Sequence, residues 1–199
     1  MKLPLTHAVA ALVLVLSFSA TVAAGPFEDA VAASRRHDYA TALGLRRQLA
    51  DQGDARGQFF LGTMYYEGLG VPQDYAEAMK WYRLAADRGD VKAQHNLGTM
   101  YANGEGVPQD YAEAVKWYRL AADQGNAKAQ RALGSMYDSG WGVPQDYVKA
   151  HMWFNLSAAQ GEQDAAEDRD KVAQRMTSAQ IAEAQKLARE WKPTTQPHR

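Results

Sequence analysis

The chain has 199 residues, a formal net charge of −1 and no cysteine, and 46% of its residues are hydrophobic. This composition excludes a wholly disordered chain, and the lack of cysteine excludes disulfides, a lipid-anchored cysteine and cysteine-based zinc or redox sites. Its charges almost balance and no long basic run occurs, which argues against a nucleic acid or an anionic membrane as partner.

Residues 1–24 have the three parts of a secretory signal peptide: a start containing Lys2, an apolar run over 8–18, and small residues up to Ala24. We expect cleavage after Ala24 and a periplasmic or secreted mature chain. Without Lys2, that chain has 21 basic and 23 acidic residues and a net charge of about −2. The alternative, an uncleaved anchor, is disfavoured because the apolar run is shorter than the ~20 residues that span a bilayer.

Residues 25–53 are expected to form an N-terminal cap. The pattern predicts a short helix over 27–36 and a second helix over 39–51. The second helix is a degenerate copy of half a repeat, in which Ala42 stands where Ala78 stands later. Atypical terminal units are expected in repeat proteins because their outer face meets water.

Residues 75–110 and 111–146 are two copies of one 36-residue unit and are identical at 26 of 36 positions. Self-similarity at this period predicts a stacked-repeat architecture in which each unit is one supersecondary element. Sequence that matches the unit continues on both sides of these copies, so we expect three repeats over 54–161.

Each repeat contains two predicted helices joined by a loop of the form G-x-G-V-P-Q-D. The first helix should begin after an Asp or Asn N-cap and end at a glycine in the left-handed conformation. These residues are Asp54, Asp90 and Asn126 at the starts and Gly68, Gly104 and Gly140 at the ends. The second helix should begin after Asp74 or Asp110. Glu77 or Glu113, three residues later, would complete a capping box, and Lys149 replaces this glutamate in the third repeat.

After the third repeat the pattern breaks, and residues 162–191 are expected to be two helices that cap the end of the stack. The first is predicted over 162–176, and the second follows a capping box formed by Thr177 and Gln180. Residues 192–199 contain two prolines and no large apolar residue, so we expect a disordered tail.

Positions that stay the same in all repeats are expected to serve the stacking, whereas positions that change are free for binding. A glycine in the middle of a helix costs about 1 kcal/mol relative to alanine, so the three in register should permit a close approach between helices. The tryptophans of the second helices are expected in the core. The retained positions are Gln58, Leu61, Gly62, Met64 and Tyr65 with their equivalents, and Ala78, Trp81, Tyr82, Leu84 and Ala86 with theirs.

The pattern over residues 91–125 reads A-x-A-Q-x-x-L-G-x-x-Y-x-x-G-x-G-V-P-Q-D-Y-x-x-A-x-x-W-Y-x-x-A-A-x-x-G, with Val91 at the first position. It resembles the Sel1-like repeat family, a relative of the tetratricopeptide repeats, over residues 54–161 and more loosely over 39–53. The resemblance implies an all-α solenoid of antiparallel helix pairs, a right-handed superhelix whose first helices line the concave side. It also implies a scaffold for protein–protein interactions. Many exported members carry a cysteine pair in each repeat, and this chain has none, so the properties of that subgroup are not carried over.

If the first helices line the concave side, their changing positions are the candidates for partner binding. The spacing of residues 59, 63 and 66 places them on one helical face. The candidates are Phe59, Thr63, Tyr66, His95, Asn96, Thr99, Asn103, Arg131 and Asp138. Trp141 is a further candidate in the loop of the third repeat. It is either an exposed anchor for a partner or packs on the neighbouring loop, and both interpretations stay open.

No catalytic motif is found: the chain has no H-E-x-x-H, S-x-x-K, G-x-S-x-G or phosphate-binding loop. The histidines are scattered without metal-ligand spacing, so we expect no metal site and no cofactor. The acidic residues over 162–170 are interleaved with basic ones and are expected to form a solvated helix face; a cation site is the less favoured alternative.

The sequence therefore predicts a non-enzymatic periplasmic or secreted adaptor that binds a protein or peptide in its concave groove. The alternative is an envelope enzyme or wall-associated factor acting on peptidoglycan-type substrates, which only the expected location motivates. Binding to another copy of the chain is a third hypothesis. Neither nucleic acid nor an integral membrane segment after cleavage is expected.

Overall fold

The computed structural model describes residues 25–194, so the expected signal peptide over 1–24 and the last residues, 195–199, lie outside the described part. The described part is all-helical, as the sequence predicts. Its helices are α1 (Pro26–Arg35), α2 (Tyr39–Asp51), α3 (Ala55–Glu67), α4 (Tyr75–Asp87), α5 (Val91–Asn103), α6 (Tyr111–Asp123), α7 (Ala127–Ser139), α8 (Tyr147–Ala158), α9 (Gln163–Ala173) and α10 (Ser178–Glu190).

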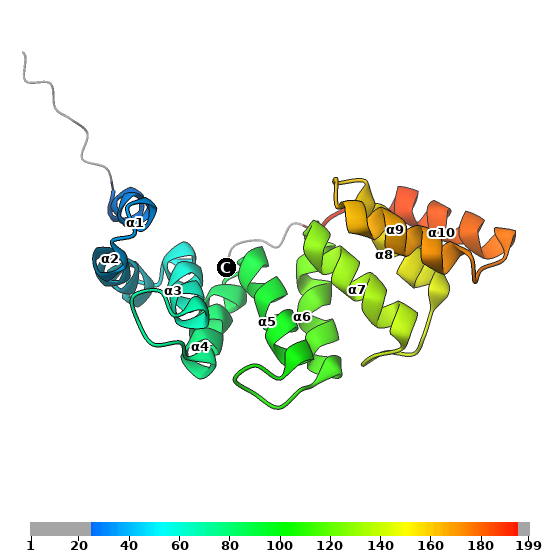
Figure 1. Ribbon diagram of the computed structural model, residues 1–199. Helices are drawn as coiled ribbons and strands as arrows, with labels where there is room; N and C mark the ends of the chain where they lie inside the picture. The colour runs from blue at the N-terminus through cyan, green and yellow to red at the C-terminus, as the bar shows by residue number, and fades with distance from the viewer. Residues whose placement is uncertain (1–24, 195–199) are drawn as a thin grey trace, which may run out of the picture.

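The helices form a curved row in which α1 to α9 each pack mainly against their neighbours in sequence (Figure 1). The pairs α3–α4, α5–α6 and α7–α8 are the three repeats, and α1 and α2 precede them. At the other end, α9 and α10 both pack against α8. The fold is therefore the predicted helical solenoid. Within residues 25–194, no helix combines the length and the apolar character needed to cross a membrane.

The helix boundaries follow from the local chemistry that the sequence indicates. The side chains of Asp54, Asp90 and Asn126 each accept a hydrogen bond from the backbone N–H three residues later. The first helices end at Gly68, Gly104 and Gly140, each with a positive φ of 70–73°. These N-caps and C-terminal glycines are confirmed.

The predicted capping boxes of the second helices are wrong. Asp74 and Asp110 cap α4 and α6 as expected. The Glu77 carboxylate, however, binds Lys80 on the same helix at 2.7 Å, and Glu113 binds Lys116 in the same way. A lysine three residues further along thus competes for the glutamate that would reach back to the cap. Among the described helices, the reciprocal box occurs at the start of α10, between Thr177 and Gln180.

The glycines in the middle of the first helices admit an aromatic ring from the second helix. A β-carbon built on Gly98 would lie 2.5 Å from Cδ1 of Tyr118. The same construction gives 2.8 Å between Gly62 and Tyr82, and 2.7 Å between Gly134 and Phe154. The close approach inferred from the sequence is confirmed: in each repeat an aromatic ring of the second helix occupies the space that a β-carbon would need.

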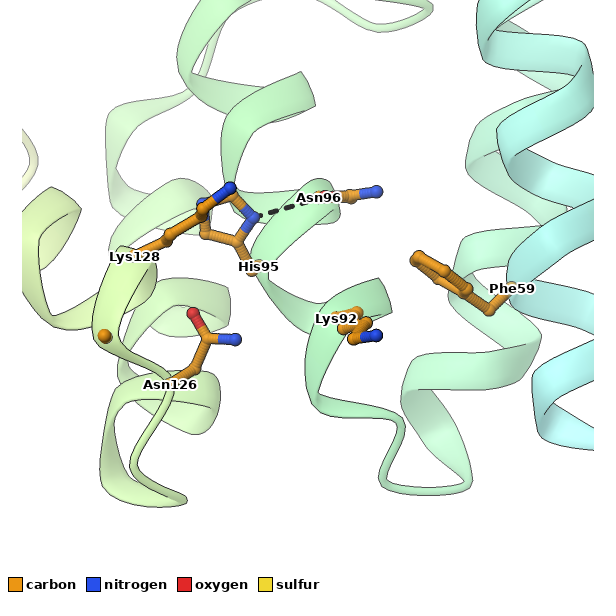
Figure 2. A pocket seen from close by; sticks show the side chains of 7 residues that line it. Phe59, Lys92, His95, Asn96, Asn126 and Lys128 are labelled. Carbon is orange, nitrogen blue, oxygen red and sulfur yellow. Dashed lines mark hydrogen bonds between the residues drawn. The ribbon is translucent and has the colours of Figure 1, made fainter. Parts of the chain in front are cut away.

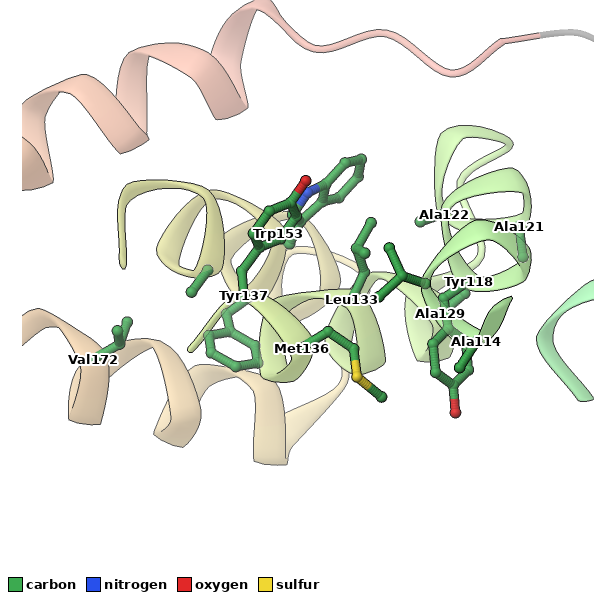
Figure 3. Close-up of a cluster of buried hydrophobic side chains, with 13 residues drawn as sticks. Ala114, Tyr118, Ala121, Ala122, Ala129, Leu133, Met136, Tyr137, Trp153 and Val172 are labelled. Carbon is green, nitrogen blue, oxygen red and sulfur yellow. The ribbon is translucent and has the colours of Figure 1, made fainter. Parts of the chain in front are cut away.

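The core runs along the row between first and second helices. Figure 3 shows its largest cluster, in which Leu133 and Met136 of α7 lie between Tyr118 of α6 and Trp153 of α8, and Tyr137 of α7 lies beside Trp153. Trp117 and Trp153 are buried as predicted, whereas Trp81 is half-buried.

The retained leucines of the second helices correct the rule that retained positions serve the stacking. Leu84 and Leu120 are 44% and 37% exposed. They lie on the outer faces of α4 and α6, each four residues after an exposed lysine, whereas Leu156 is half-buried on α8, the helix that α10 covers. The last copy of this position is therefore the least exposed of the three.

The retained glutamines tie consecutive repeats together. Gln94 donates from its amide nitrogen to the carbonyl oxygen of Ala86 at the end of α4, 3.3 Å away. Gln58 and Gln130 make the same bond to Ala50 and Ala122. A buried side-chain amide that satisfies a helix-terminal carbonyl explains why this polar residue is retained inside the stack.

The segment after α10 returns along the stack. Trp191 meets Trp153 edge to face, with ring centroids 6.2 Å apart. The backbone N–H of Thr194 donates to the carbonyl oxygen of Asp123 at the end of α6, at 2.7 Å. The Thr194 hydroxyl donates to the same carbonyl at 3.2 Å. Residues 192–194, the start of the tail that the sequence predicts to be disordered, thus lie against the end of α6, and the rest of that tail lies outside the described part.

Candidate partner-binding groove

Three adjoining hollows follow the first helices. The first lies between α1, α3 and α5, the second between α3, α5 and α7, and the third between α5, α7 and the residue that caps α9. Phe59 and Lys92 line both the first and the second; His95 and Lys128 line both the second and the third. Because neighbouring hollows share walls, we treat them as one continuous groove and call it the groove below.

The first hollow is aromatic. The rings of Phe59 and Phe60 lie 5.1 Å apart, and Phe60 is 5.7 Å from Phe27 of α1. The guanidinium of Arg56 lies 4.4 Å from the centre of the Phe27 ring, a cation–π contact. The hollow has a volume of about 400 Å³, enough for a large side chain of a ligand.

The second hollow is more polar. In Figure 2, Phe59 extends from α3 toward α5, while Lys92 and His95 project from α5 and Lys128 reaches in from α7. Nδ1 of His95 lies 3.2 Å from Oδ1 of Asn96, and the imidazole packs on Tyr118. Burial lowers the pKa of His95 below its ordinary value, so the imidazole is neutral at pH 7 and can both donate and accept.

Basic residues recur along the rim of the groove. Arg56, Lys92 and Lys128 occupy the same position, the second residue of α3, α5 and α7. All three are exposed. The predicted binding set omits them, because it was drawn from positions whose chemistry changes between repeats. The signal that would have found them is a basic residue retained in all three copies of one exposed position.

The comparison with protein families decides what this architecture is. Residues 55–90, 91–126 and 127–162 each match the family described as Sel1 repeat. The chain belongs to the Sel1 repeat family.

Solved structures agree with this assignment. A Sel1 repeat protein from Oxalobacter formigenes is 34% identical, with a TM-score of 0.69 over 72% of this chain and 59% of that one. The protein c5321, described as a protective antigen of uropathogenic Escherichia coli with an SLR fold, is 27% identical, with a TM-score of 0.52 over 83% of this chain and 44% of that one. This chain thus spans less than two thirds of either protein. A search of the curated proteins gave no match.

Sel1 repeat proteins generally act as scaffolds for protein–protein interactions, and the family is typically non-catalytic. Of the residues proposed from the sequence, Phe59, His95, Asn96 and Arg131 line the groove of this Sel1 repeat protein. The others have different surroundings.

Arg131 and Asp138 hold the C-terminal helices onto the last Sel1 repeat. The guanidinium of Arg131 binds the carboxylates of Asp164 and Asp168, each at 2.8 Å. Asp138 binds Arg175 at 2.6 Å. Two residues of the acidic cluster therefore form ion pairs with α7, which corrects the expectation that the whole cluster is a solvated face. In the described part, no group of three or more His, Asp or Glu side chains is placed to hold a metal ion.

The threonines are part of the repeat framework. The Thr63 hydroxyl accepts a hydrogen bond from the Tyr82 hydroxyl at 3.1 Å, and Thr99 accepts one from Tyr118 at 3.2 Å. In the third repeat the ring is Phe154, which has no hydroxyl, and a serine replaces the threonine. The change at this position thus follows the aromatic partner.

Tyr66 and Asn103 meet at Glu105, away from the groove. The Tyr66 hydroxyl donates to one oxygen of Glu105 at 2.9 Å, and the Asn103 amide donates to the other at 3.1 Å. Burial and this carboxylate raise the pKa of Tyr66 to about 12. The contact joins the first two repeats.

Trp141 combines the two alternatives considered from the sequence. Its ring stacks on Tyr111, with centroids 5.2 Å apart and planes inclined by 13°. It is nevertheless 49% exposed. One face packs on the start of α6, and the rest of the indole remains open to solvent, outside the groove.

Proposed function

We propose that this chain is an exported, non-enzymatic scaffold that binds a partner protein through the groove. The observation that carries the proposal is the continuity of the three hollows, which share Phe59, Lys92, His95 and Lys128. A groove that crosses several repeats offers a partner a long surface. Binding to it costs little conformational entropy, because the stacked repeats already fix its shape. Its exposed wall mixes aromatic, imidazole and cationic groups, which suits a protein surface.

Export is the second part of the proposal and rests on the signal-peptide pattern over residues 1–24. It is tested by expressing the full chain in a Gram-negative host, fractionating the cells and sequencing the N-terminus of the recovered protein. A periplasmic or secreted product that begins at Gly25 is expected. A cytoplasmic product that begins at Met1 would contradict export.

The groove is tested by photocrosslinking in the native envelope. A photoreactive amino acid is placed at position 95 inside the groove, or at Lys186, which is exposed on α10. Adducts with a partner protein, identified by mass spectrometry, are expected at position 95 and absent at 186. The same adducts from both positions, or none from position 95, would contradict binding in the groove.

The alternative is an envelope enzyme that acts on peptidoglycan-type substrates. No catalytic motif and no metal-binding cluster in residues 25–194 supports it. It is tested by incubating the purified protein with cell-wall material, for which no turnover is expected.

A further inference from the structure

The rim of the groove carries positive charge that the fold does not use. Lys92 and Lys128 are exposed, and neither makes an ion pair with another residue of the described part. Arg56 is paired with Asp54 at 3.4 Å and is 61% exposed, so water weakens that pair.

The acidic groups beside these lysines are already engaged. Asp90 directs its carboxylate to the N–H of Ala93, and the equivalent residue in the next repeat is the uncharged Asn126. The first turn of α7, which is capped by the uncharged Asn126, adds the positive end of a helix dipole to the second hollow. The charge of the second hollow is therefore positive.

The net positive charge falls off in the third hollow, where carboxylates offset the basic residues that line it. In the third hollow, Arg131 is neutralised by Asp164 and Asp168, and Glu162 lines the wall. Charge thus falls from basic to neutral along the groove, with the aromatic hollow of Phe27, Phe59 and Phe60 at the basic end. A ligand that matches this gradient has a large apolar residue next to carboxylates.

We propose that the groove binds an extended acidic segment of a partner protein, a proposal that rests on the proposed function. An apolar side chain of this segment would occupy the aromatic hollow, and its carboxylates would lie over Lys92 and Lys128. An extended chain advances about 3.3 Å per residue, so a segment of about nine residues spans roughly 30 Å, enough to reach several helices of the row. Nucleic acid, the other common polyanion, is disfavoured because the whole chain has a net charge of −1.

The test is fluorescence anisotropy with the purified protein and a labelled nonapeptide of sequence Gly-Phe-Gly-Glu-Ser-Glu-Ser-Glu-Gly. This peptide is expected to bind, and replacing its glutamates by glutamine or its phenylalanine by alanine is expected to weaken binding at least tenfold each. The protein variant with Lys92→Glu and Lys128→Glu should lose binding to a similar extent. Lys186→Glu on α10 is the matched control and should bind like the native protein.

Both reversed lysines are exposed, so the variant is expected to melt at the native temperature, and this is checked by circular dichroism. Equal affinity for the glutamate and glutamine peptides, or unchanged binding by the double variant, would overturn the proposal. So would an oligothymidylate of nine nucleotides that binds as tightly as the acidic peptide. If the acidic segment fails while position 95 still crosslinks to a protein, the groove binds a partner of other chemistry; if both fail, the proposed function fails with it.

Discussion

The amide of Gln124 donates to the side-chain oxygen of Gln94, 2.8 Å away. Gln94 in turn donates to Ala86 of the preceding repeat, so the pair ties α4, α5 and α6 together. Gln160 and Gln130 repeat the bond one unit later, at 2.7 Å. The bonds from Gln94 and Gln130 to the helix-end carbonyls are buried, whereas the bonds between the glutamines are partly buried. Buried hydrogen bonds are costly to break from one side.

Gln94→Leu should therefore lower the free energy of unfolding by about 1–3 kcal/mol, mainly because it removes the buried donor to the Ala86 carbonyl. It also removes one of the two acceptors of the Gln124 amide, which keeps its bond to the carbonyl oxygen of Leu120 at 3.2 Å. Urea unfolding of the single variants and of the double variant with Gln124→Ala measures the coupling. The second substitution should cost less in the Gln94→Leu background than alone. Additive losses would show that the two side chains do not interact.

The first repeat lacks the second half of this tie, because Arg88 stands where Gln124 and Gln160 stand later. The side-chain oxygen of Gln58 is accordingly buried without a hydrogen-bond partner. Arg88→Gln should supply that partner and raise the free energy of unfolding by about 0.5–1.5 kcal/mol. Gln124→Arg, the reverse exchange, should lower it. A loss of stability in Arg88→Gln would contradict the equivalence of the repeats.

Gly98→Ala should destabilise the protein although alanine favours helix. The new methyl group would meet the Tyr118 ring at 2.5 Å, and overpacking of this kind costs about 1–3 kcal/mol, against a gain in helix propensity of about 1 kcal/mol. Gly44→Ala on α2 is the matched control, because nothing lies within 4 Å of its added carbon. Thermal melts should move in opposite directions; a stabilised Gly98→Ala would refute the packing reason for the glycine.

Arg131→Gln should loosen the C-terminal helices without unfolding the repeats. It removes both ion pairs to α9, and partly exposed pairs contribute up to about 1 kcal/mol each. Hydrogen exchange followed by mass spectrometry should show faster exchange in α9 and unchanged exchange in α5. Lys171→Gln, which removes a more exposed charge, is the control. Equal protection of α9 in Arg131→Gln and the native protein would mean that the pairs do not hold the cap.

Stability should fall as the pH drops from 7.5 to 5. Burial lowers the pKa of His95, and burial together with Arg169 lowers that of His151. A histidine with a lowered pKa in the folded state binds protons more tightly in the unfolded chain. Its contribution to the free energy of unfolding is therefore complete above the unfolded pKa near 6.5 and is lost as the pH falls through and below that value. Melting temperatures of the native protein and of the double variant His95→Gln and His151→Gln measure this, and the variant should show the flatter profile. Parallel profiles would assign the pH dependence to other groups.

Much of the fold can be predicted from the sequence, because the interactions that define the helices lie between residues that are close in the chain. The caps at Asp54, Asp90 and Asn126 and the glycines at the helix ends act within a few residues, and the glycines facing Tyr82 and Tyr118 recur at a fixed distance from their rings. A comparison of the three repeats then distinguishes the retained positions, most of which pack in the stack, from the positions that change.

The same comparison misleads where the environment of the copies differs. Leu84 is retained but exposed, since no helix covers α4 as α10 covers α8. Arg131 changes between copies because it meets Asp164 and Asp168, more than thirty residues away on a helix outside the repeats. Contacts at such separation leave no periodic signal. Lys92 and Lys128 belong to the proposed binding surface although the basic residue at this position is retained, so retention alone does not identify a framework position.

The bond from Thr194 to Asp123 joins residues 71 positions apart in a fold whose other contacts are mostly between neighbouring helices. Such a contact raises the contact order of the C-terminal half, because the chain must close a long loop before the contact forms. The N-terminal repeats can stack as soon as they are made. Contacts between neighbouring repeats close short loops, whereas the contact at α6 requires the segment that follows α10 and closes a long one.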